Sequence, residues 1–166
     1  MQKSHVFYGI IAGVCCVAYY LLFYFIEKEL FFHPGVYWSS WLPFLGIMLM
    51  AALRERSGSE SDYSWRRALK ACFTIFVAGS AIFQCFYYLF FNFGDPALAA
   101  IQQEVILENL QRYREIFGDA AIGQLEKGAA AERLKYDLGT AFQSFARSAI
   151  GGFIVSLALA FALKKE

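Results

Sequence analysis

The chain has 166 residues, of which 58% are hydrophobic and only 17% charged, and its formal net charge is +1 at pH 7. Soluble domains carry about a quarter charged residues, so this chain has too few to cover a water-facing surface. Soluble α/β enzyme folds, collagen-like repeats and disordered tails are thereby excluded, and no strong field favours nucleic acid as a partner; the length fits one membrane domain over residues 1–166.

The first two apolar stretches predict the first two membrane spans. Residues 4–26 carry no charge and end at Glu27, which predicts a span over about 5–26. Residues 30–53 are also uncharged, but His33-Pro34-Gly35 is typical of a turn, so the second span is expected over about 37–53. Both stretches are long enough to cross about 30 Å of hydrocarbon.

Two further spans are predicted in the second half of the chain. Residues 71–94 contain no charge and predict a span over about 71–93. The last apolar stretch, with the helical pattern before it, predicts a span over about 140–163 that includes Arg147, whose long side chain can reach the headgroups. The expected fold is all-α: an integral membrane four-helix bundle with a helical extracytoplasmic insertion between spans three and four.

The orientation follows from basic residues in the short connections. The connection over 54–70 carries five of them, and Lys3, Lys164 and Lys165 lie near the two ends of the chain, whereas the opposite short connection has only Lys28. Both termini are therefore expected in the cytoplasm and the segment over about 95–139 outside it.

The outer segment carries helix signals of its own. Asp95-Pro96 is a typical helix start and Gly118 a typical stop. A second helix is expected over about 119–127, and a third from about Ala129 that runs on into span four. The segment is interpreted as an amphipathic cap, on the headgroups or over the bundle, with a lid or partner-docking surface as the alternative.

Small residues at helical spacing predict close helix–helix seams, which membrane helices need because lipid offers no hydrophobic contrast. Span one contains Gly9 and Gly13, four residues apart. Span four carries five small residues, each four apart: Ser144, Ser148, Gly152, Ser156 and Ala160. Packing within one chain is the favoured interpretation, and a homodimer or a membrane-protein partner stays open.

Aromatic residues gather toward the outer ends of spans one to three. Trp38, Trp41, Tyr87 and Tyr88 are candidate contacts for membrane lipids or a partner. An interfacial aromatic belt accounts for the Tyr and Trp residues. The many Phe residues are less well explained by a belt, so an aromatic-lined cleft for a lipid-like or isoprenoid ligand is the alternative.

Four polar residues complete the candidate contacts. Gln84 lies near the middle of span three and needs a partner there, expected to be a hydroxyl or a backbone carbonyl. Arg147 is expected either to bind a lipid phosphate or an acidic group, or to act as a snorkelling anchor. Arg66 and Arg67 fit contact with anionic lipid or a cytoplasmic docking patch.

No motif for chemistry is found. The common hydrolase, nucleotide-binding and metalloprotease signatures are missing, and the spans contain no carboxylate. We therefore expect no enzyme, no catalytic residue, no metal and no cofactor. The four cysteines are expected to be buried thiols that pack as small apolar groups: Cys15, Cys16, Cys72 and Cys85.

Three segments resemble a bacterial membrane-protein family catalogued as domain of unknown function 4199. They are YGIIAGV at residues 8–14, YSWRRALK at 63–70, and GFIVSLALA at 152–160 with the closing Lys164-Lys165; the stretch Tyr113–Glu115 fits as well. The resemblance implies a bacterial inner-membrane protein with four helices and no assigned catalytic residues. The leading hypothesis is a non-enzymatic accessory or scaffold subunit, and the alternative is a binder or carrier of a lipid-like ligand in the outer cleft.

Overall fold

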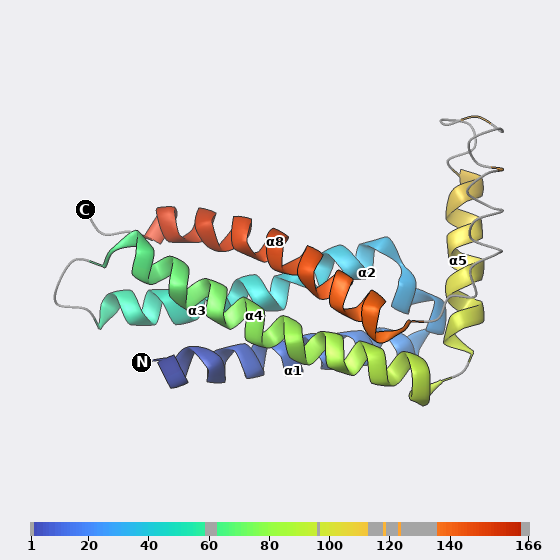
Figure 1. Ribbon diagram of the computed structural model, residues 1–166, viewed down its shortest axis with the longest axis horizontal. Coiled ribbons are helices and arrows are strands. Elements are labelled where there is room, and N and C mark those ends of the chain that lie inside the picture. Colours follow the sequence, from blue (N-terminus) through green and yellow to red (C-terminus); the bar gives the residue numbers. More distant parts are fainter. Residues whose placement is uncertain are drawn as a thin grey trace.

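The computed structural model describes residues 2–58, 63–95, 97–112, 118, 123 and 136–163. Within these residues the secondary structure is helical, with no strand (Figure 1). In chain order the elements are α1 (Gln2–Ile26), η1 (Lys28–Phe32), α2 (Pro34–Ser39), α3 (Trp41–Ser57), α4 (Trp65–Leu89), η2 (Phe90–Gly94), α5 (Leu98–Arg112) and α8 (Leu138–Leu163).

Among the described residues, four helical stretches are long and apolar enough to cross a membrane, which confirms the predicted four-helix architecture. They are Ser4–Ile26, Pro34–Ser57, Trp65–Gly94 and Leu138–Leu163. They run alternately in opposite directions (Figure 1). At one end, called here the terminal end, α1 begins and α8 finishes; the other end, called the α5 end, holds η1, α2, η2 and α5.

Three predicted span boundaries are wrong by a few residues: the start of the second span, its end, which lies at Ser57 and not at 53, and the start of the third. The second stretch begins at Pro34, because a proline fits the first helical turn, where its missing N–H would have no partner, and His33 Nδ1 accepts from the Gly35 N–H at 3.1 Å. The third begins at Trp65, so Arg66 and Arg67 belong to its first turn. Charged residues mark the expected limit of an apolar stretch, but they do not stop a helix.

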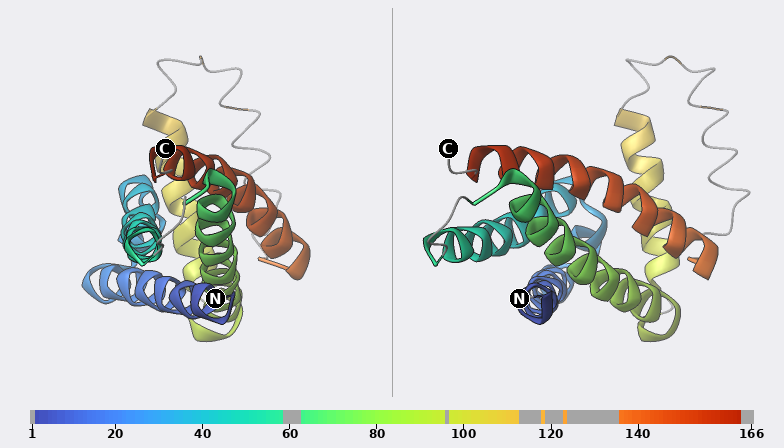
Figure 2. Two further views of the ribbon diagram at one scale, coloured as in Figure 1. Left: turned by 90° about the vertical axis from the view of Figure 1, so that its left-hand side faces the viewer. Right: turned by 60° about the vertical axis from the view of Figure 1, so that its left-hand side comes forward.

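α4 is the central helix, and α1 packs against it through small residues (Figure 2). A Cβ on Gly9 would lie 2.6 Å from the Ala78 Cβ, and a Cβ on Gly13 would lie 2.8 Å from the Gly79 carbonyl oxygen. Both distances are too short for a real side chain. The predicted seam of span one is therefore a seam within the chain.

α8 packs against the other side of α4 through the C-terminal part of its small-residue row. Ser156 is fully buried, Ala160 is buried, and a Cβ on Gly152 would collide with the Phe76 ring. α8 starts at Leu138, where the Asp137 carboxylate accepts from the Thr140 N–H at 2.7 Å. The prediction that a helix from about Ala129 runs on into span four is thus wrong, since Tyr136 and Asp137 are not helical and α8 begins at its own N-cap.

α5 crosses the end of the bundle instead of following its axis (Figure 1). Leu98, in its first turn, is fully buried, and α5 contacts η1. Asp95 Oδ1 accepts from the Ala97 N–H at 2.9 Å, in agreement with the predicted helix start. Gly118 has φ +79°, a conformation that suits a helix stop. The helix predicted over 119–127 lies outside the described residues apart from Gly123, as does the segment Tyr113–Glu115.

The cysteines divide into two pairs. Cys16 and Cys72 are buried, as expected, whereas Cys15 and Cys85 are exposed on the outer faces of α1 and α4. The prediction that all four are buried is wrong for the second pair. A thiol in an apolar stretch can face lipid as readily as protein, because both surroundings are apolar.

Candidate functional site

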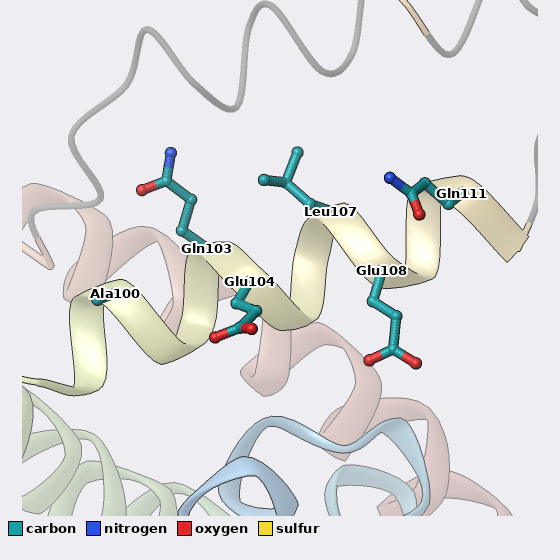
Figure 3. Close-up of a pocket in the computed structure, with 6 residues that line it drawn as sticks. All are labelled: Ala100, Gln103, Glu104, Leu107, Glu108 and Gln111. Carbon is teal, nitrogen blue, oxygen red and sulfur yellow. The ribbon is translucent and has the colours of Figure 1, made fainter.

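Two concave regions formed by described residues are candidates for a site. The first is a groove of about 520 Å³ along α5, lined by Ala100, Gln103, Glu104, Leu107, Glu108 and Gln111. Figure 3 shows Glu104 and Glu108 on one side of this helix and Gln103 and Leu107 on the other. Because its described wall is a single helix, it offers no converging groups for a ligand.

The second region is a cavity of about 590 Å³ between the long helices, and each of the described helical elements except η2 contributes to its wall. It exists because α8 packs closely on α4 but makes few contacts with α3. Ser144 and Ser148, in the N-terminal part of the small-residue row, therefore face the cavity, while the residues in its C-terminal part are buried against α4.

Most of the wall is aromatic. Ten of the lining residues are Tyr20, Phe31, Phe32, Tyr37, Trp41, Phe44, Phe76, Phe83, Tyr87 and Tyr136. Many of these rings hold one another: the Tyr20 ring lies 4.8 Å from Phe83 and 5.3 Å from Phe31, and Phe31 stacks on Tyr87 at 5.4 Å. Such ring pairs stabilise a fixed geometry beyond simple burial, so this apolar wall is largely preformed.

One part of the wall is polar and is built from two distant segments. The Tyr136 hydroxyl donates to Gln84 Oε1 at 2.8 Å, so of the two expected partners, a hydroxyl or a backbone carbonyl, the structure shows a hydroxyl. Tyr136 is held in turn by Asn92 Nδ2, which donates to its carbonyl at 2.8 Å, and by Tyr87, whose ring lies 4.8 Å away. Burial raises the pKa of the Tyr136 hydroxyl, which therefore stays neutral and able to donate.

Arg147 is the one charged side chain among the described residues that line the cavity. It lies on α8 between Ser144 and Ser148, and it is exposed. Ser148 uses its hydroxyl to donate to the Ser144 carbonyl at 2.6 Å. The guanidinium of Arg147 makes no hydrogen bond or ion pair with any residue in the described part of the chain.

The structure brings four of the eight predicted contact residues together. Gln84, Trp41, Tyr87 and Arg147 all line the cavity.

The other four lie elsewhere. Trp38 is 70% exposed on the outer surface, and the Tyr88 ring packs beside Phe93. At the terminal end, Arg66 lies over the Trp65 ring at 5.7 Å, and Arg67 Nε donates to Glu55 Oε1 at 2.8 Å.

Several lining residues were not predicted as a site. Tyr136 precedes the last span in a polar segment, and nothing in its neighbourhood along the chain points to Gln84. Gln102 belongs to α5, and Ser144 and Ser148 belong to a small-residue row that predicts packing. The one available signal for these two serines is the length of the row, which covers more helical turns than a single helix–helix contact requires.

A second polar cluster lies at the terminal end of the bundle. Glu55 Oε2 lies 3.0 Å from His5 Nε2, so this carboxylate joins α1 to α3, and through Arg67 it also reaches α4. The guanidinium of Arg67 lies 6.0 Å from the fully buried Tyr63 ring. Burial raises the pKa of Tyr63 to about 12. These contacts tie helix ends together, and no group of metal-binding residues is found in the part of the chain that the structure describes.

Comparisons with known proteins yield one match. The family described as "Protein of unknown function (DUF4199)" matches residues 7–165, nearly the whole chain. No curated protein and no solved structure matches the chain.

Proposed function

This chain belongs to the DUF4199 family, and we propose that it binds a lipid-like ligand in the cavity between α8 and the other long helices. The observation that carries the proposal is the aromatic, partly polar cavity of about 590 Å³. Sites for small molecules measure about 300–1,000 Å³ and combine apolar walls with a few placed polar groups. A cavity of this kind suits a ligand with one apolar hydrocarbon chain and a polar head group.

The place of the cavity in the bilayer is part of the proposal. We propose that the four long helices lie in a bacterial cytoplasmic membrane, as the family resemblance implies, and the distribution of basic residues supports an orientation with both termini in the cytoplasm. The α5 end then faces outward and α5 lies along the membrane surface. In this arrangement the cavity belongs to the outer leaflet, where a lipid can enter sideways.

We propose binding without chemistry. The described lining residues include no carboxylate and no imidazole, which are the side chains most used for general acid–base catalysis. Cys16 lines the cavity, but its thiol lies beside the Ser40 carbonyl at 3.9 Å and has no base next to it among the described residues.

A role as accessory or scaffold subunit is the second candidate. It is supported by α5, much of which extends beyond the long helices and leaves Glu104, Glu108 and Gln111 exposed (Figure 1). A partner protein could contact this surface while the cavity holds a lipid. Recovery of a defined membrane-protein partner that is lost when α5 residues are changed would support this role.

Trp41 provides a direct test of the cavity, because the chain has three tryptophans and only Trp41 lines it. In a full-length Trp38→Phe, Trp65→Phe variant, a fatty acid with a brominated chain should quench Trp41 fluorescence saturably, and an unbrominated competitor should reverse the quenching. The matched control keeps Trp65 alone, which stacks on Phe161 toward the terminal end. Quenching that is linear and equal for both reporters would contradict the proposal.

Filling the cavity gives a second test. Ser148→Phe places a ring in the cavity, whereas Ala146→Phe changes an exposed residue of the same helix that does not line it. We expect the saturable quenching of Trp41 to be lost in Ser148→Phe and kept in Ala146→Phe. Equal quenching in the two variants, both with helical content like the parent, would count against a ligand in this cavity.

A further inference from the structure

We propose that the ligand carries a single negative charge on its head group and that Arg147 is its counter-ion; this inference rests on the proposed binding function. The observation behind it is a cation on the cavity wall that has no partner among the described residues. Arg147 lies within the apolar stretch Leu138–Leu163 and forms no ion pair or hydrogen bond with any described residue. A charged residue inside a membrane-spanning stretch usually pairs with another group, because an apolar medium does not solvate it.

Arg147 lies well inside α8, away from both ends of the helix. It follows Leu138 by nine positions, and at 1.5 Å per residue this is about 14 Å along the helix. The side chain lies on the cavity wall, so the cavity is a direct path by which an anion can reach it.

Neutral donors on the facing helix fit an oxygen-rich head group. Gln84 uses its Oε1 to accept from Tyr136, and its amide N–H groups make no hydrogen bond with a described residue. Both Gln84, on α4, and Arg147, on α8, line the cavity. A guanidinium with an amide donor on the facing wall can bind a carboxylate or a phosphate oxygen.

The number of cations limits the charge of the ligand. With one charged side chain among the described lining residues, the site neutralises one negative charge. A phosphodiester or a carboxylate carries one charge, whereas a diphosphate carries more and would leave the excess buried without a partner. The geometry therefore favours a monoanionic acyl lipid over an isoprenoid diphosphate.

Binding of defined lipids to the purified full chain in a neutral detergent, followed by native mass spectrometry, tests this inference. The probes are phosphatidylglycerol and oleic acid as the two sources of a single charge, diacylglycerol as the neutral reference, and farnesyl diphosphate. We expect at least one monoanionic lipid to bind about tenfold more tightly than diacylglycerol, a difference of about 1.4 kcal/mol, because an anionic oxygen forms a stronger hydrogen bond with the guanidinium than a neutral oxygen does.

Arg147→Gln should abolish this preference and leave diacylglycerol binding and thermal stability near the parent values, while Arg147→Lys should retain part of the preference. Arg56→Gln, in the last turn of α3 at the terminal end, is the matched control and should bind like the parent. Preference for phosphatidylglycerol or for oleic acid identifies the source of the charge, and either supports the inference.

An unchanged preference in Arg147→Gln, or a preference for farnesyl diphosphate, would overturn the inference and leave lipid binding itself intact. Failure of the parent chain to bind any of the four probes would instead overturn the proposed function.

Discussion

Replacing Gly13 by alanine tests the close approach of α1 to α4. A Cβ at this position would lie 2.8 Å from the Gly79 carbonyl oxygen, while ordinary van der Waals contact begins at 3.4 Å. The difference, 3.4 − 2.8, requires a local separation of about 0.6 Å. The atom in the way belongs to the main chain, so no rotamer change relieves the clash and the helices themselves must move.

The cost follows from this displacement. A gap of about 0.5–1 Å forfeits about a quarter to a half of each dispersion contact along the seam, and overpacking typically costs about 1–3 kcal/mol. Alanine in a helix recovers about 0.5–1 kcal/mol relative to glycine. We therefore expect Gly13→Ala to lower the free energy of unfolding by about 1–2 kcal/mol.

The assay is reversible unfolding of the full chain in mixed micelles of increasing SDS fraction, followed by circular dichroism. Gly46→Ala is the matched control, because a Cβ at Gly46, in α3, meets nothing within 4 Å. This control variant should be as stable as the parent, or more stable by up to about 1 kcal/mol. A Gly13→Ala chain as stable as the Gly46→Ala chain would refute the account of the seam.

Three further predictions concern polar contacts. The lysine that pairs with Asp95, together with a backbone N–H and a tyrosine hydroxyl, lowers the pKa of this carboxyl to about 2. The contribution of the ionised carboxylate to folding stability is therefore present above about pH 4 and is lost as the pH falls toward 2. Over this range the melting temperature should fall more steeply for the parent than for Asp95→Asn. Tyr136→Phe should cost about 1–2 kcal/mol by leaving Gln84 Oε1 without its donor, and a double-mutant cycle with Gln84→Leu should show a smaller combined loss than the sum. Arg67→Gln should destabilise the chain by about 1 kcal/mol or more because its carboxylate partner is half-buried, whereas Arg66→Gln should change the unfolding curve little.

The membrane helices could be predicted closely because the property that defines them is local. A run of uncharged residues shows where a helix can cross hydrocarbon, and the described helices contain the four predicted ranges almost entirely. The misplaced boundaries, at Pro34, Ser57 and Trp65, lie where helix geometry and hydrophobicity differ, since a helix can begin before its apolar part and end after it. The start of α8 after Asp137 is not predicted, because an N-cap depends on a single side chain.

The candidate site could be predicted only in part. Arg147 and Gln84 attract attention in any membrane sequence, because polar groups in apolar stretches need a partner. The partner of Gln84 is Tyr136, 52 positions away, and no local pattern connects them. Trp38 and Trp41 look alike in the sequence, yet only Trp41 lines the cavity, because the two side chains leave the backbone in different directions.

The sequence by itself determined that the chain is built from four apolar helices with small-residue seams, because the length and charge of each segment decide whether it can lie in a bilayer. Only the tertiary structure decided that a cavity exists and which side chains face it. In the row of small residues on α8, Gly152 and Ser156 pack against α4, whereas Ser144 and Ser148 line the cavity. The difference arises from how α8 packs on its neighbours, closely on α4 and sparsely on α3, and this is a property of pairs of helices that no single segment contains.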